Sequence, residues 1–281
     1  MTDTCPIDNL DKILLATDGS RYSEGAVREA LYLAEKCSGH LTAISVVEAN
    51  VEFAAQAPDF VEKQENQARK YLEAIKAEAD AAGVKAAIET HTGESVYQII
   101  VDEARKNASE IIVMGRRGMT GIKRMAMGSV TARVVGHQPC DVLVVPRDCP
   151  TEFRTILAAN DGSPHGEAAA GDAIKIARKV GGSLIAFSAA ASGDKAPEAR
   201  ENVRKVKQMA ESEGLACETM TATGKPFARI VETAMDKNID LIVVGCHGRG
   251  RLGKLLMGHV TERVIGHSKC AVLVSCSQSR N

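Results

Sequence analysis

The chain contains no tryptophan and few aromatic residues, which limits how its interior can be built. Only 3% of its 281 residues are aromatic, whereas 44% are hydrophobic. We therefore expect cores made mainly of Val, Ile, Leu, Ala and Met. No apolar stretch approaches the ~20 residues that a helix needs to cross a membrane. The N-terminus also lacks the basic-then-apolar pattern of a secretory signal. These absences predict a cytoplasmic protein without a membrane partner.

The chain also lacks an excess of either charge. It has 35 Lys and Arg residues against 36 Asp and Glu residues, a net charge of −1 with histidine neutral. Domains dedicated to binding DNA or RNA usually carry a basic excess, so we expect no nucleic-acid partner. The eight cysteines are scattered and form no Cys-x-x-Cys pair. In a cytoplasmic chain such cysteines are typically free thiols that pack as small apolar side chains.

The sequence contains the same series of motifs twice. The segment KILLATDGS at 12–20 corresponds to TILAANDGS at 155–163, and EIIVMGRRG at 110–118 corresponds to DLIVVGCHG at 240–248. The offset falls from 143 residues for the first pair to 130 for the second, so the first copy holds about a dozen extra residues. A long repeat of this kind indicates two copies of one domain.

The boundary between the copies lies near 146–152, where proline and charged residues interrupt the pattern. We predict two domains, residues 1–148 and 149–281. The extra residues of the first copy lie around the segment VEFAAQAPDFVEKQ. Whether they form a flap or a surface for a partner is left open.

Each copy alternates short apolar runs with helical patterns. The runs ILLAT at 13–17 and LTAISVV at 41–47 are typical of buried strands, and Val27, Ala30 and Ala34 recur at the spacing of a buried helix face. Strands that alternate with helices predict an α/β fold with a parallel sheet covered on both faces. The strand order 3-2-1-4-5 keeps every crossover right-handed and makes strands 1 and 4 neighbours.

Two strand ends of the first copy carry the residues that a ligand would meet. Ligands of open α/β sheets bind beyond the carboxyl ends of strands where the strand order reverses. The first strand ends at Asp18, which suits a ribose hydroxyl or a base amino group, and the fourth runs into a glycine-rich loop. Gly128 and Ser129 begin a predicted helix whose N-terminus favours phosphate, and the Ser129 and Thr131 hydroxyls would add hydrogen bonds. This polarity predicts a nucleotide.

These motifs resemble those of the universal stress protein family, in a form with two domains in tandem. The ATP-binding subgroup of that family has the pattern Gly-x2-Gly-x9-Gly-(Ser/Thr), which the first copy matches. The resemblance implies Rossmann-like domains with five-stranded sheets, dimerisation through the last strand, and binding of ATP or AMP or ADP with Mg²⁺. It implies nucleotide contacts from Asp18, Val46, Met114, Gly115, Arg117, Gly118, Gly128, Ser129, Val130 and Thr131.

The second copy keeps the glycine spacing but replaces the serine by His259. The resemblance implies that its contacts come from Asp161, Gly245, His247, Gly248, Gly258, His259, Val260 and Thr261. A hydrogen bond to a charged group is worth ~1.5–3 kcal/mol, although a protonated imidazole would restore part of it. We therefore expect the first site to bind nucleotide better, and we leave open whether the second binds any.

Cys246, His247 and His259 raise the question of a metal or redox site in the second copy. Cys246 directly adjoins His247, and the three lack the spacing that is typical of zinc ligands. We predict no metal site, and a redox role stays open.

No residue is identifiable as a catalytic group. A phosphate hydrolase needs a general base or an activated water beside the phosphate, and we expect Asp18 and Asp161 at the other end of the nucleotide. We predict a regulatory stress-response protein for which the nucleotide is a signal, with slow ATPase activity at most. The alternatives are an enzyme that transfers or hydrolyses phosphoryl or nucleotidyl groups, and a scaffold with empty crevices.

The last strand of each copy predicts how the copies meet. The segments DVLVV and AVLVS are apolar, and as sheet edges they would expose unpaired backbone groups. We predict that they pair with each other inside one chain. A further homodimer of the whole chain is left open.

Overall fold

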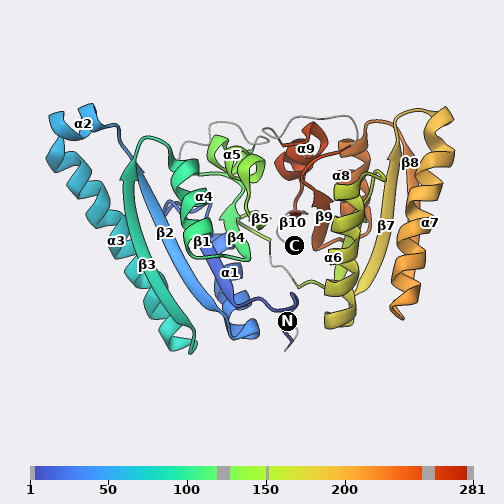
Figure 1. Ribbon diagram of the computed structural model, residues 1–281, viewed down its shortest axis with the longest axis horizontal. Helices are drawn as coiled ribbons and strands as arrows, with labels where there is room; N and C mark the ends of the chain where they lie inside the picture. Colours follow the sequence, from blue (N-terminus) through green and yellow to red (C-terminus); the bar gives the residue numbers. More distant parts are fainter. Residues whose placement is uncertain (1–3, 119–126, 150–151, 249–256, 277–281) are drawn as a thin grey trace.

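The computed structural model describes residues 4–118, 127–149, 152–248 and 257–276. Within these residues, ten strands form one sheet in the order β3-β2-β1-β4-β5-β10-β9-β6-β7-β8 (Figure 1). Neighbouring strands are parallel within each half, and the junction between β5 and β10 is antiparallel. The two predicted α/β domains are therefore halves of one continuous sheet.

The first half follows the predicted alternation of strands and helices. Its elements are β1 (Lys12–Ala16), α1 (Glu24–Cys37), β2 (His40–Glu48), α2 (Val51–Gln56), α3 (Pro58–Ala81), β3 (Lys85–Gly93), α4 (Val96–Lys106), β4 (Ile111–Gly115), α5 (Ser129–His137) and β5 (Asp141–Val145). The predicted strand order 3-2-1-4-5 is confirmed.

The second half repeats this series. Its elements are β6 (Thr155–Ala159), α6 (Pro164–Val180), β7 (Ser183–Ala190), the 3₁₀ helix η1 (Gly193–Lys195), α7 (Ala196–Ser212), β8 (Cys217–Thr223), α8 (Pro226–Asp236), β9 (Leu241–Gly245), α9 (His259–His267) and β10 (Ala271–Ser275). Helix α6 begins as its sequence dictates, because the Ser163 side chain accepts a hydrogen bond from the Gly166 N–H and Pro164 needs no partner at the first helical position.

Alternate residues of each strand enter two separate cores. Ile13 and Leu15 pack on the face that α1, α3, α6 and α7 cover, whereas Leu14 packs on the face of α4, α5, α8 and α9. Successive side chains of a strand point to opposite faces, so an unbroken apolar run supplies both cores. Helices therefore cover both faces of the sheet, as predicted.

The last strands of the two halves pair inside the chain, as predicted. Leu143 lies opposite Leu273, and Val144 lies opposite Val272. All four side chains are at most 2% exposed. Pairing removes both apolar edges from solvent, so the edge that the family resemblance assigns to dimerisation is already occupied within one chain.

The cysteines differ in part from expectation. Cys5 and Cys37 form a disulfide that ties the N-terminal segment to the end of α1, which contradicts the prediction of free thiols for these two. Nothing in the spacing of the two cysteines indicates this pairing. Cys140, Cys149, Cys217, Cys246, Cys270 and Cys276 are free and buried, as expected for small apolar side chains.

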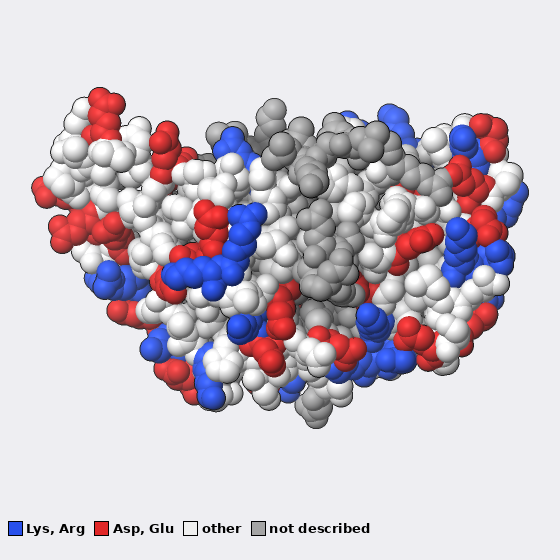
Figure 2. Space-filling model, in the orientation of Figure 1, with Lys and Arg blue, Asp and Glu red and all other residues white. Residues whose placement is uncertain are grey.

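The outer surface shows no dominance of one charge on the face that Figure 2 displays, where basic and acidic side chains are interspersed. Among the described residues, no helix combines the length and the apolar composition that crossing a membrane requires.

Packing at the β5–β10 junction can be tested by truncating Leu143. Because its side chain is fully buried, Leu143→Ala should lower the free energy of unfolding by about 2–5 kcal/mol, measured by urea denaturation. The control is Val51→Ala, at a side chain that is 89% exposed, which should change it by less than about 0.5 kcal/mol. Equal stability of the two variants would contradict the described junction.

Candidate functional site

The first half contains a cavity of about 550 Å³ at the carboxyl ends of β1 and β4. This is within the usual size range of small-molecule sites. Its lining includes every residue that the sequence predicts for this half: Asp18, Val46, Met114, Gly115, Arg117, Gly118, Gly128, Ser129, Val130 and Thr131. The part of the glycine-rich loop at 119–126 lies outside the described residues.

The loop after β4 lies directly against the loop after β1. A Cβ atom added to Gly118 would lie 2.6 Å from Oδ2 of Asp18, so a larger residue at 118 would have to displace this carboxylate. The other carboxylate oxygen of Asp18 accepts a hydrogen bond from the Ser20 N–H at 3.0 Å. This places a fixed negative charge beside the first glycines of the loop.

Two donors expected to serve the ligand are used by the protein itself. Thr131 is 3% exposed, and its hydroxyl donates to the Gly115 carbonyl at 3.0 Å. The Gly128 N–H donates to the Arg116 carbonyl at 2.9 Å. The Thr131 hydroxyl thus fixes α5 to the end of β4 in this structure, and the hydrogen bond expected from it to phosphate stays a prediction.

The remaining donors belong to the first turn of α5. This helix begins at Ser129, whose side chain is exposed, with Gly128 in an extended N-cap conformation. The first amide N–H groups of any α-helix have no partner within that helix, and its N-terminus carries a partial positive charge. The main-chain groups from Ser129 onward thus form an anion-binding end of the cavity.

Helices α2 and α3 supply a wall of the cavity that the sequence analysis missed. Phe53, Phe60 and Tyr71 line it. The two phenylalanine rings meet edge to face at 5.9 Å between centroids, and a Cβ atom on Gly19 would lie 3.3 Å from the Tyr71 ring. The signal available in the sequence was the extra segment of the first copy, which folds as α2 and the start of α3.

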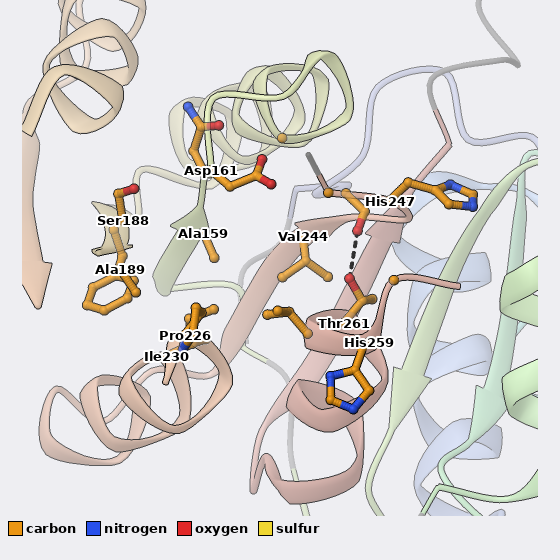
Figure 3. A pocket seen from close by; sticks show the side chains of 17 residues that line it. Ala159, Asp161, Ser188, Ala189, Pro226, Ile230, Val244, His247, His259 and Thr261 are labelled. Atoms are coloured by element: carbon orange, nitrogen blue, oxygen red, sulfur yellow. Dashed lines mark hydrogen bonds between the residues drawn. The ribbon is translucent and has the colours of Figure 1, made fainter. Parts of the chain in front are cut away.

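The second half contains a smaller cavity, of about 320 Å³, at the equivalent place (Figure 3). It also brings together every predicted residue: Asp161, Gly245, His247, Gly248, Gly258, His259, Val260 and Thr261. Phe187, Pro226 and Ile230 complete its apolar side. None of the described residues of η1 or α7 lines it, whereas α3 closes the first cavity.

The scaffold of the two cavities is the same. The Thr261 hydroxyl donates to the Gly245 carbonyl at 2.9 Å, drawn as the dashed line in Figure 3. A Cβ atom on Gly248 would lie 2.8 Å from Oδ2 of Asp161. His259, by contrast, is exposed, and its ring points away from Asp161 (Figure 3).

The three residues considered for a metal or redox site are not brought together as the sequence suggested. Cys246 and His247 are close to His165 of α6, which the sequence analysis did not consider, and His259 does not belong to this cluster. His165 lies two residues after Ser163, and no sequence pattern connects it with Cys246, which is 81 residues further on.

Comparisons with known proteins agree with this architecture. A sequence model of the universal stress protein family matches residues 9–146 and again residues 152–275. A universal stress protein of Staphylococcus epidermidis is 31% identical over 151 residues, which are 52% of this chain and 90% of that protein. One from Staphylococcus aureus is 32% identical with the same coverage.

Solved structures share the whole two-domain fold. The crystal structure of a universal stress protein from Archaeoglobus fulgidus superposes with a TM-score of 0.78 at 22% identity, covering 95% of this chain and 98% of that one. A universal stress protein from Pseudomonas aeruginosa gives 0.71 at 20% identity, covering 95% and 93%. The double match of the family model and the shared tandem fold show that this chain belongs to the universal stress protein family.

Proposed function

We propose that the first half of this protein binds an adenine nucleotide, ATP in the first instance, and that the bound nucleotide acts as a signal rather than as a substrate. The observation that carries the proposal is the cavity of about 550 Å³ in which a helix N-terminus and a carboxylate lie at the ends of neighbouring strands. A nucleotide has this same distribution of groups, with anionic phosphates at one end and hydrogen-bond donors on its sugar and base.

The phosphate end of the ligand belongs at the start of α5. The amide N–H groups of its first turn favour an anion, and the exposed hydroxyl of Ser129 adds a donor. Arg117 lines the same cavity and adds positive charge. The Ser129 hydroxyl is an oxygen ligand of the kind that Mg²⁺ accepts besides phosphate and water.

The sugar and base belong on the side of β1, β2 and α3. The carboxylate of Asp18 accepts hydrogen bonds but repels phosphate, so it favours ribose hydroxyls or a base amino group. Val46 and Ile100 offer apolar contact, and Tyr71 offers an aromatic face. Helix α3 lines the first cavity, whereas the corresponding helix α7 does not line the second. The first half is therefore the better site for a base.

The proposal that the nucleotide is a signal rests on the lack of a well-placed general base for ATP hydrolysis in the described lining of the cavity. Among the described residues of this cavity, the carboxylates are Asp18 and Glu48, and histidine is absent. One oxygen of Asp18 is held by the Ser20 N–H, and the carboxylate lies against Gly118 rather than at the start of α5. A general base must reach the attacking water beside the phosphate, so we expect slow ATP hydrolysis at most.

The matched glycines at the starts of α5 and α9 test the placement of the phosphates. Both have backbone angles that any residue adopts, with φ −67° and ψ 148° at Gly128 and φ −61° and ψ 132° at Gly258. A Cβ atom would lie 3.4 Å from the nearest atom at 128 and 3.3 Å from the Cys246 carbonyl at 258, so circular dichroism checks that both valine variants fold while their methyl groups obstruct the helix N-terminus. We expect Gly128→Val to lower ATP affinity at least about tenfold and Gly258→Val to leave it unchanged.

The measurements are calorimetric titration with ATP and mass spectrometry of nucleotide released from the purified proteins. Equal affinity and equal nucleotide content in the two variants would refute the placement in the first half. Release of inorganic phosphate at a steady rate of many turnovers per minute by the parent protein would refute the signalling role and leave the placement intact.

The serine that differs between the halves tests the contribution of its hydroxyl. Loss of a hydrogen bond to a charged phosphate costs ~1.5–3 kcal/mol, so Ser129→Ala should weaken ATP binding about 10- to 100-fold. The reciprocal change His259→Ser should strengthen any binding to the second half. Ser212→Ala, at the exposed end of α7, is the control for calorimetry. An unchanged affinity in Ser129→Ala would show that this hydroxyl does not reach the nucleotide.

A further inference from the structure

The end of β9 and the start of α6 bring two histidines and a cysteine together in the second half. The distance from Cys246 Sγ to His165 Nδ1 is 3.6 Å, and that from Cys246 Sγ to His247 Nδ1 is 3.1 Å. The ligand atoms of all three residues lie within 4.8 Å of one another. Cys246 is buried, whereas both histidines are partly exposed, so an ion from solvent would reach the sulfur from the histidine side.

These separations are close to those of a tetrahedral metal site. With Zn–S near 2.3 Å and Zn–N near 2.0–2.1 Å, a cysteine sulfur and a histidine nitrogen bound to one tetrahedral ion lie about 3.5 Å apart. The two observed distances fall on either side of this value. The histidine nitrogens, which would lie about 3.3 Å apart in such a site, are within 4.8 Å here, so binding one ion by all three residues requires the two rings to rotate toward each other.

The cluster also contains an unsatisfied group. Among the described residues, the buried Nε2 atom of His247 has no hydrogen-bond partner, but it lies on the side of the ring opposite Nδ1, the atom that faces the Cys246 sulfur. The ring extends away from Asp161 and from the centre of the cavity (Figure 3). His247 therefore faces the cysteine rather than a ligand in the cavity.

We propose that His165, Cys246 and His247 bind a divalent cation of borderline softness, of which Zn²⁺ is the type, with the fourth position open. Two imidazoles and one thiolate are the ligand types that Zn²⁺ prefers over Mg²⁺ or Ca²⁺. An open fourth position leaves room for water or an anionic group at the edge of the second cavity, which His247 also lines.

The protonation states agree with this ligand set. Burial and the neighbouring His247 lower the pKa of His165, so its imidazole is neutral at neutral pH and its nitrogen can donate a lone pair. Burial raises the pKa of the Cys246 thiol to about 11 in the absence of an ion. The ion must therefore displace the thiol proton, and one proton leaves for each ion bound: the S–H bond breaks as the S–metal bond forms.

The first half provides an internal comparison. The repeat offsets place Tyr22 where the second half has His165, and Arg116 and Arg117 where it has Cys246 and His247. The guanidinium of Arg116 donates to the Ser268 carbonyl at 2.6 Å. The first half thus carries permanent positive charge at this place, and a bound cation would supply positive charge to the second half.

The experiment is titration of the full-length protein with Co²⁺ and Zn²⁺, under anaerobic conditions and without added reductant, so that the disulfide between Cys5 and Cys37 stays closed. Tetrahedral Co²⁺ with a thiolate ligand gives strong visible bands and a sulfur-to-metal charge-transfer band. We expect one ion per chain, both spectral features, and displacement of Co²⁺ by Zn²⁺. About one proton should be released to the solvent for each ion bound.

Three variants decide whether the cluster is the site. Substitution of residues that only contact a metal ligand lowers metal affinity 10- to 100-fold. Removing a ligand itself should cost more, so we expect Cys246→Ser to bind the metal at least about 100-fold more weakly and to lack the charge-transfer band. His165→Tyr, which introduces the residue that the first half has there, should weaken binding at least about tenfold. Cys217→Ser is the matched control, because Cys217 is also free and buried but lies on β8, and it should bind as the parent protein does.

Circular dichroism of the metal-free variants checks their folding, and if Cys246→Ser does not fold, His165→Tyr decides alone. Absence of saturable binding by the parent protein, a Co²⁺ spectrum without the thiolate band, or equal affinity in His165→Tyr and the parent would each overturn the proposal.

Discussion

The antiparallel pairing of β5 with β10 is the constraint on which the rest of the structure depends. A parallel half-sheet leaves its last strand with unpaired backbone groups and apolar side chains on both faces. Joining the two last strands covers both edges and buries Leu143 against the partner half. It also brings the loops of one half to the other, since Arg116 after β4 donates to the carbonyl of Ser268 after α9. One chain therefore holds two crevices in a fixed relation.

The two halves share the residues that shape the loops around each cavity and differ in the residues that a ligand would contact. Gly118 and Gly248 have no room for a Cβ atom beside a carboxylate, and Thr131 and Thr261 make the same internal hydrogen bond. These features are steric or structural requirements of the loop. The halves differ instead in the wall formed by α2 and α3, and in the residue at the start of α5 or α9. The differences therefore lie on the surfaces of the cavities rather than in the backbone that shapes them.

The sequence predicted the strands and their order from apolar runs, helical spacing and the crossover rule, and the resemblance to the family predicted residues in the lining of both cavities. The sequence did not predict features that depend on where distant segments meet. Phe60 reaches the cavity only because α3 packs over β2 and β3, and His165 approaches Cys246 across three crossovers. The disulfide between Cys5 and Cys37 also depends on two segments that only the fold brings together. The internal hydrogen bond of Thr131 was not predicted either, because the sequence shows a donor but not its partner.

The electrostatics of the two cavities give a second reason, besides the missing serine, for unequal anion binding. Among the described residues, Arg117 lines the first cavity, whereas the lining of the second contains no Lys or Arg but retains the carboxylate of Asp161. A unit charge at 4 Å contributes about 1 kcal/mol in water and about 4 kcal/mol near a protein surface, a range that spans the ~1.5–3 kcal/mol of one hydrogen bond to a charged group. A cation held by Cys246 and two histidines would reverse this deficit. Because binding linkage is reciprocal, an anion in the second cavity would then tighten the hold on the cation by the same factor.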